Sequence, residues 1–130
     1  KLKKHESPSK KSEVCLYIEN FWYLLEVKTN AIKKDIKSNL NSQIVSDLIF
    51  KEILNIKNLS SNTNIEYIEG NQEIEILSKK VDQNKKSLGI ELYPHKIEEI
   101  TSIADIGENM PPKSTWIEPK LRSGLIIYEY

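Results

Sequence analysis

The first regular pattern along the chain is a pair of short apolar runs. Apolar side chains alternate over residues 13–18, and a second run of aromatic and aliphatic residues follows over 21–28. Asn20 separates the runs and belongs to a residue type that tolerates positive φ, so the pattern predicts a β-hairpin with a tight turn. Trp22 and Tyr23 leave opposite faces of a strand, so we expect one of them, not both, to be largely buried.

Three later segments carry apolar residues at helical spacing. The first contains Ile44, Val45, Leu48, Ile49 and Ile53, the second Ile74, Leu77 and Val81, and the third Ile97, Ile100, Ile103 and Ala104. Spacing of three and four residues predicts an amphipathic helix for each. Ser42 is expected to cap the start of the first helix, and Gly107 is expected to end the third.

Short strands are predicted between and after these helices. IEYI, at 65–68, leads to Gly70; SLGIELY, at 87–93, is stopped by Pro94; and GLIIYEY closes the chain at 124–130. Strands and helices therefore interleave without repeats. This order predicts an α+β domain in which a mixed sheet starts with a hairpin, carries three packed helices and ends with a C-terminal strand.

The length of 130 residues suits one domain, which we place at 13–130. Residues 1–12 are basic, contain Ser and Pro, and lack periodicity, so they are expected to be a connector or flexible arm. The alternative is a polybasic arm that binds phosphate. No apolar run reaches the roughly 18 residues of a membrane span, and the first residues lack the apolar core of a signal peptide.

Charge and cysteine content narrow the function classes. Acidic and basic residues number 19 each, so no global field favours nucleic acid or an anionic membrane, and nucleic acid is not an expected partner. Cys15 is the only cysteine, which excludes an internal disulfide and a Cys-rich zinc site. It is expected to be a small strand residue, the alternative being a reactive thiol. The absence of disulfides is typical of a cytoplasmic protein.

No standard catalytic, nucleotide-binding or metal-spaced motif is present, so the sequence indicates neither a cofactor nor a metal. His95 follows Pro94 at a strand-to-helix junction, which makes it a candidate site residue, with a plain surface histidine as the alternative. Asp47 lies between the apolar positions Val45 and Leu48. A half-buried aspartate needs a partner, so a cap or salt bridge is the expectation and catalysis the alternative.

The densest group of hydrogen-bond donors follows the third predicted helix. It consists of Lys113, Ser114, Thr115, Lys120, Arg122 and Ser123, and Arg122 is the only arginine of the chain. Prolines at 111, 112 and 119 stiffen the segment, which lowers the entropy lost when donors converge on an anion. The group predicts a phosphate- or carboxylate-binding loop over 110–125. The alternative is a rigid crossover whose lysines are merely solvated.

The same segment carries a family resemblance. MPPKSTWIEPKLRSGL, at 110–125, resembles the C-terminal signature of a bacterial and archaeal family catalogued as domain-of-unknown-function family one thousand and fifteen, sometimes labelled ParB-like. LYIENFWYLLEV, SDLIFKEILNI and NIEYIEG resemble other family segments, so the similarity runs from Val14 onward. Leu24 stands where members usually have arginine, and Glu69 where they have glycine.

The resemblance implies a place for this chain in a longer protein. Family chains carry an N-terminal half ahead of this part, so the chain resembles a C-terminal portion, with its own N-terminal half as a partner. ParB-like folds include enzymes that phosphorylate free serine. The resemblance therefore implies a module handling serine or phosphoserine.

We expect an enzyme module for phosphoryl transfer or phosphate-ester hydrolysis on a small phosphorylated or carboxylate metabolite. Lys113 and Arg122 would bind the anion, with help from Ser114 and Thr115. One alternative is a ParB-like nucleic-acid or nucleotide-binding regulator. The other is a structural or homodimerisation module without chemistry. The sequence pairs no base with a nucleophile.

Overall fold

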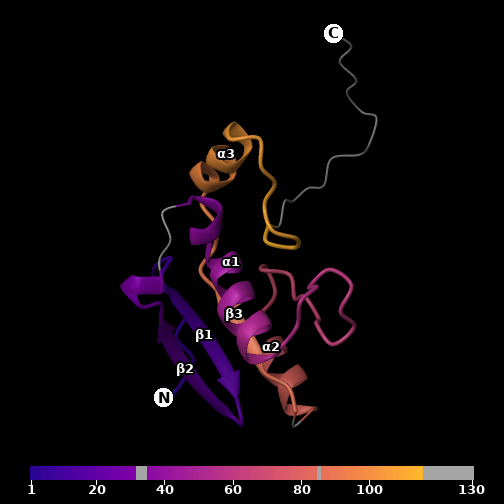
Figure 1. Ribbon diagram of the computed structural model, residues 1–130. Coiled ribbons are helices and arrows are strands. Elements are labelled where there is room, and N and C mark those ends of the chain that lie inside the picture. The colour runs from indigo at the N-terminus through magenta and orange to yellow at the C-terminus, as the bar shows by residue number, and fades with distance from the viewer. Residues whose placement is uncertain (32–34, 85, 116–130) are drawn as a thin grey trace.

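The computed structural model describes residues 1–31, 35–84 and 86–115. Its elements in chain order are strand β1 (Glu13–Ile18), strand β2 (Phe21–Glu26), the short 3-10 helices η1 (Thr29–Ala31) and η2 (Lys37–Asn39), helix α1 (Asn41–Val45), π-helix η3 (Ser46–Ile53), helix α2 (Ile74–Asp82), strand β3 (Gly89–Leu92) and helix α3 (Ile97–Asp105). The expected α+β class is confirmed, with a hairpin at the start and the helices α1, α2 and α3 after it (Figure 1).

The described sheet is antiparallel, in the order β2-β1-β3. Ile18 pairs with Phe21, and the two residues between them, Glu19 and Asn20, have φ of 50° and 65°. Positive φ at both central residues is the requirement of a tight hairpin turn, so that prediction is confirmed. The strand predicted at 124–130 lies outside the described residues.

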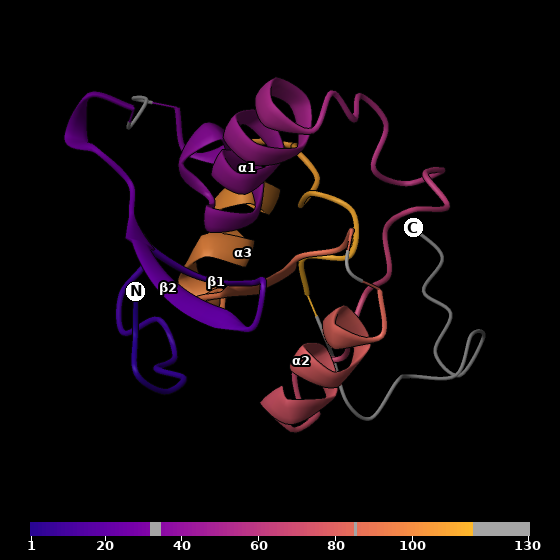
Figure 2. The ribbon, with the colours of Figure 1, turned by 90° about the horizontal axis from the view of Figure 1, so that it is seen from below.

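Different helices pack against the two faces of the sheet. Val14 and Leu25 line an apolar pocket together with Ile44 and Val45 of α1. On the opposite face, Tyr17 packs in a cluster with the α2 side chains Leu77 and Val81. Figure 2 shows α1 on one side of the sheet, and α2 and the N-terminal segment on the other.

The N-terminal segment forms no helix or strand, but it crosses the sheet. The Leu2 N–H donates to the Trp22 carbonyl at 2.8 Å, in an isolated bridge to the outer edge of β2. Farther along, Ser7 donates to the Glu91 carboxylate of β3 at 2.9 Å, and Pro8 is buried. Segment 1–12 therefore spans the sheet from one outer strand to the other.

Several local predictions are corrected. Residues 65–68 form no strand. The Ile68 side chain instead packs against the cluster of Tyr17, Leu77 and Val81, so it is partly buried without strand pairing. Trp22 and Tyr23 do leave opposite faces, but both are half-buried, so the expectation that one is largely buried is wrong. The reason is their position on β2, an outer strand of the described sheet, where neither face is fully covered.

The first predicted helix changes its winding partway. It begins at Asn41 after an extended Leu40, so the expectation that Ser42 caps it is wrong. From Ser46 it continues as a π-helix, whose wider turn shifts side chains off the face expected for 3.6 residues per turn. Ile53 is consequently 73% exposed.

The second and third predicted helices are confirmed as α2 and α3. Leu77 and Val81 of α2 are buried, and Ile103 anchors α3. Gly107, at φ 72°, follows α3 as predicted. Among the described residues, no helix is both long enough and apolar enough to cross a membrane.

Candidate functional site

The predicted anion loop is described only in its first part. Lys113 and Thr115 are exposed, and Ser114 turns its hydroxyl back to the Pro111 carbonyl at 2.6 Å. That bond is local to a turn, which Lys113 passes with φ of 57°. Lys120 and Arg122 lie outside the described residues. The anion-binding interpretation of 110–125 therefore stays a prediction.

Asp47 has the structural role that the sequence favoured. Its carboxylate accepts from Lys51 Nζ at 2.6 Å, in an i,i+4 ion pair on η3, and from the Gln43 amide at 3.0 Å. The expected salt bridge is present, and it gives the partly buried Asp47 carboxylate, whose side chain is 24% exposed, a charged partner. Nothing in this arrangement presents the carboxylate to a substrate.

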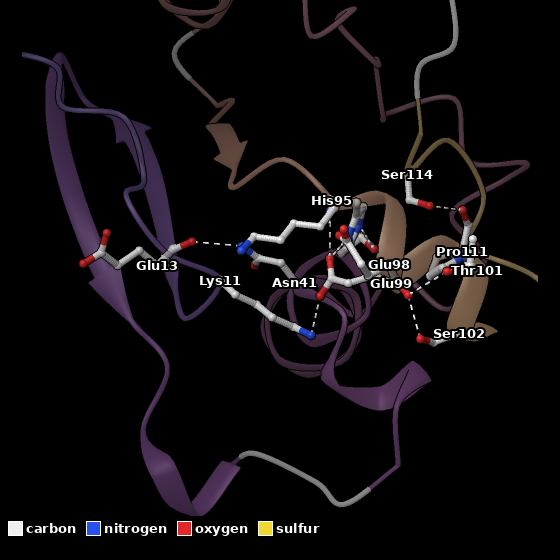
Figure 3. Close-up of polar contacts among 12 residues, drawn as sticks. Lys11, Glu13, Asn41, His95, Glu98, Glu99, Thr101, Ser102, Pro111 and Ser114 are labelled. Atoms are coloured by element: carbon white, nitrogen blue, oxygen red, sulfur yellow. Dashed lines mark hydrogen bonds and ion pairs between the residues drawn. The ribbon is translucent and has the colours of Figure 1, made fainter.

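His95 occupies a different environment from a surface histidine. It lies between β3 and α3, and its side chain is only 7% exposed, so the surface alternative is wrong. Its Nε2 atom is 3.1 Å from the Ser42 hydroxyl oxygen of α1. Its Nδ1 atom is 3.1 Å from a Glu99 carboxylate oxygen of α3, and Figure 3 shows His95 beside Glu99. Both ring nitrogens are therefore engaged, by two groups of different chemistry.

Glu99 is held as a carboxylate by its neighbours. Lys11 Nζ lies 2.5 Å from the second carboxylate oxygen, and the Lys96 backbone N–H donates to the first at 3.3 Å. Burial by itself would raise the pKa of Glu99, but the hydrogen bonds from Lys11 and His95 outweigh it, and the net pKa is lowered. Since an ionised carboxylate only accepts, His95 Nδ1 must donate to it.

The local fold fixes these groups relative to one another. His95 lies just before α3, and Glu99, in the first turn of that helix, turns its carboxylate back toward the Lys96 N–H and the His95 ring. The start of α1 is fixed by Asn41, which is 1% exposed and whose amide donates to the Glu13 carbonyl of β1 at 3.0 Å. Ser42 follows directly, so its hydroxyl is placed by a buried neighbour.

This arrangement can move a proton. With Nδ1–H donated to Glu99, the lone pair of Nε2 faces the Ser42 hydroxyl and can accept its proton. Glu99 would then stabilise the imidazolium that forms. We define Ser42, His95 and Glu99 as the relay. The sequence paired no base with a nucleophile, whereas the structure places the His95 imidazole beside the Ser42 hydroxyl.

Among the three residues of the relay, the sequence indicates one as a candidate site residue. His95 was a candidate, whereas Ser42 was assigned to capping. His95 and Glu99 are only four residues apart in the sequence, and this closeness is the signal for their contact. The partnership of Ser42 and His95, which are 53 residues apart, has no sequence signal because it depends on how α1 packs beside α3.

The described residues also contain one group that could ligate a metal. The nearest ligand atoms of His5, Cys15 and Glu91 all lie within 4.8 Å of one another. Cys15 is fully buried, and burial together with the nearby Glu91 carboxylate raises the pKa of its thiol to about 11. The sequence indicated no metal because these residues come from three distant segments.

Comparison with known proteins adds no assignment. No family model, curated protein or solved structure matches this chain. The resemblance carried by residues 110–125 therefore stays an expectation, and the function is argued from the relay.

Proposed function

We propose that this chain carries the hydroxyl-activating site of an enzyme that transfers or hydrolyses phosphate esters of a small metabolite. Ser42 supplies the hydroxyl, His95 is the base and Glu99 orients the imidazole. The observation that carries the proposal is the engagement of a 7% exposed imidazole by a carboxylate on one nitrogen and a hydroxyl on the other.

The reaction follows from these positions. Ser42 Oγ attacks the phosphorus of a monoester while its proton passes to His95 Nε2. The Oγ–P bond forms, the bond from phosphorus to the ester oxygen breaks, and the imidazolium returns the proton to the departing oxygen. Water, deprotonated by the same imidazole, then attacks the phosphorus. The Oγ–P bond breaks, the imidazolium returns the proton to Ser42 Oγ, and phosphate leaves. General-base assistance of this kind contributes about 10²–10⁴-fold.

Two features support a phosphate ester as the substrate class. The donor group predicted at 110–125 suits an anion, and its first basic member, Lys113, is exposed to solvent. The resemblance to a family linked with serine handling favours serine or phosphoserine as the metabolite. Both features are expectations from sequence, and they set the choice of substrates for testing.

Acyl transfer is the second candidate. The order hydroxyl, imidazole, carboxylate is the one that serine hydrolases use on several unrelated folds, and the Ser42–His95–Glu99 contacts have that order. An ester hydrolase would use the same proton path and would attack a carbonyl carbon in place of phosphorus. The substrate, not the relay, separates the two candidates.

The direct test uses an organophosphate that phosphorylates activated serines. The chain is treated with diethyl p-nitrophenyl phosphate, release of p-nitrophenol is followed, and the modified residue is located by mass spectrometry. We expect one adduct, at Ser42. Ser42→Ala should abolish it, and His95→Ala should slow it by about 10²-fold or more. The matched control is Ser78→Ala, because Ser78 is also a helical serine but donates only to the Glu75 carbonyl.

Turnover then separates the candidates. We expect p-nitrophenyl phosphate and phosphoserine to be hydrolysed in a Ser42-dependent manner, whereas Ser42-dependent hydrolysis of p-nitrophenyl acetate alone would favour acyl transfer. Absence of the Ser42 adduct, or equal labelling of wild type and His95→Ala, would refute the proposal. The Ser42–His95 contact would then serve only to hold α3 against α1.

A further inference from the structure

We propose that His5, Cys15 and Glu91 form a binding site for Zn²⁺ or a similar borderline divalent cation, separate from the relay. The site lies on the face of the sheet that the N-terminal segment crosses, opposite α1 (Figure 2). Binding there would clamp the N-terminal segment to β1 and β3. The inference does not depend on the proposed function, since no member of the relay belongs to the site.

The three ligands converge from distant parts of the chain. Cys15 of β1 and Glu91 of β3 are register partners, so their side chains leave the same face side by side. His5 is brought over them by the N-terminal segment, and its ring packs edge-on against Trp22 with centroids 4.6 Å apart. His5 Nε2 lies 2.6 Å from a Glu91 carboxylate oxygen. Placement of each ligand therefore rests on backbone pairing or ring packing.

The ligand chemistry selects the ion. Thiolate, imidazole and carboxylate are the three protein ligand types of zinc, and three of them leave a fourth position for water. Mg²⁺ and Ca²⁺ prefer oxygen ligands, so the thiol sulfur and the imidazole nitrogen do not suit them. In the polar surroundings of the site, Ser7 donates to the other Glu91 carboxylate oxygen at 2.9 Å, which orients the ligand as outer partners of metal sites do.

The geometry needs only small adjustments. With bonds of about 2.0–2.3 Å in a tetrahedron, neighbouring ligand atoms stand about 3.3–3.7 Å apart. The 2.6 Å contact of His5 with Glu91 would open by about 1 Å, and the widest separation in the group, at most 4.8 Å, would close by a similar amount. Side-chain rotation supplies such movements without shifting the strands.

The surroundings of Cys15 favour a cation over a purely structural role. A fully buried strand position is normally faced by apolar side chains, yet a carboxylate lies directly across from this thiol. His5 and Glu91 are only 22% and 23% exposed, so solvent screens them little. A bound divalent cation would offset the unfavourable placement of a carboxylate beside a buried thiol, because both groups would then be its ligands.

Metal titration of the chain without an affinity tag tests the proposal. Co²⁺ serves as a spectroscopic probe, because a cysteine ligand adds a thiolate-to-cobalt charge-transfer band and tetrahedral coordination gives strong visible bands. We expect one Co²⁺ per chain with both features, displaced by one Zn²⁺. His5→Ala and Glu91→Gln should each weaken Zn²⁺ binding by about tenfold or more, and Cys15→Ser should remove the charge-transfer band.

His95→Ala is the matched control, since it removes the other histidine and none of the proposed ligands. It should leave the Co²⁺ spectrum and Zn²⁺ affinity unchanged. His5→Ala alters a side chain outside the buried core, so it tests the site even if Cys15→Ser fails to fold. Absence of the thiolate band, or equal loss of affinity in His5→Ala and His95→Ala, would mean an adventitious ion only and would overturn the proposal.

Discussion

Glu99→Gln is the substitution that examines the relay most directly. The amide keeps the size of the side chain and can still accept from the Lys96 N–H, but it removes the charge that pairs with Lys11 and orients His95. Two losses are therefore expected. One is in the free energy of unfolding, and the other is in the reactivity of Ser42 toward the organophosphate.

The stability loss can be sized from exposure. The Lys11 ammonium is 44% exposed, so its ion pair with Glu99 contributes at most about 1 kcal/mol. The His95 bond is well covered, and its weakening from a charged to a neutral acceptor costs about 1 kcal/mol. The sum, about 1–2 kcal/mol, corresponds to a fall in Tm of roughly 3–8 °C for a chain of this length.

The pH dependence has a definite sign. The folded-state pKa of Glu99 is lowered from 4.5, so its stabilisation is present above the unfolded pKa and is lost as pH falls through the folded pKa. Wild type and Glu99→Gln should therefore differ near neutrality and converge in acid. Denaturant unfolding at several pH values measures this difference directly.

A neighbouring carboxylate provides the control. Glu98 is exposed and lies in the same first turn of α3, so Glu98→Gln tests helix-dipole effects without touching His95. It should change stability by less than about 0.5 kcal/mol. Organophosphate labelling of Ser42 should slow by about tenfold or more in Glu99→Gln and not in Glu98→Gln. Equal behaviour of the two variants, or a stability difference that persists in acid, would refute the reasoning.

Three further outcomes are expected on the sheet. Gly89→Ala should cost about 1–3 kcal/mol in thermal or denaturant unfolding, because its Cβ would stand 2.0 Å from Leu77 Cδ2; a neutral result would show that Leu77 rotates freely. Tyr17→Phe should cost about 1 kcal/mol in the same assay, through loss of the 2.9 Å hydroxyl bond to Asp82; an unchanged midpoint would mean that water replaces it. Cys15 should react with a disulfide reagent in the metal-free native chain far more slowly than after unfolding, because it is 0% exposed and its thiol has a pKa of about 11; fast native labelling would contradict its burial.

The parts of the fold that the sequence predicted are those decided by local pattern. The 19–20 turn lies between two strands that pair directly, and Leu77 and Val81 face a single neighbouring surface, so alternation and helical spacing were sufficient. Residues 65–68 resemble a strand because three of the four, Ile65, Tyr67 and Ile68, are β-branched or aromatic. Whether such a segment joins a ladder depends on partners that composition does not contain.

In the candidate sites too, contacts between residues close in the sequence could be predicted, and contacts between distant residues could not. The ion-pair partner of Asp47 is Lys51, four residues along the same helix, and such a local pair can be predicted from the sequence. Ser42 and His95 meet across 53 positions of sequence, and His5 and Glu91 across 86, through packing of whole elements. No single-sequence pattern encodes those distances, and each residue taken alone has an ordinary structural explanation.

The N-terminal segment links the two proposed sites and determines how they can be separated. His5 contacts Glu91, and Lys11 forms an ion pair with Glu99, so these two residues of the expected phosphate-binding arm are used in contacts within the chain. Deleting the segment would disturb both sites at once and could assign neither. Point substitutions can: His5→Ala should weaken Zn²⁺ binding and spare Ser42 labelling, whereas Lys11→Ala should slow labelling and spare Zn²⁺ affinity. If either variant altered both readouts, the segment would have to move as one unit, and the sites would be coupled through it.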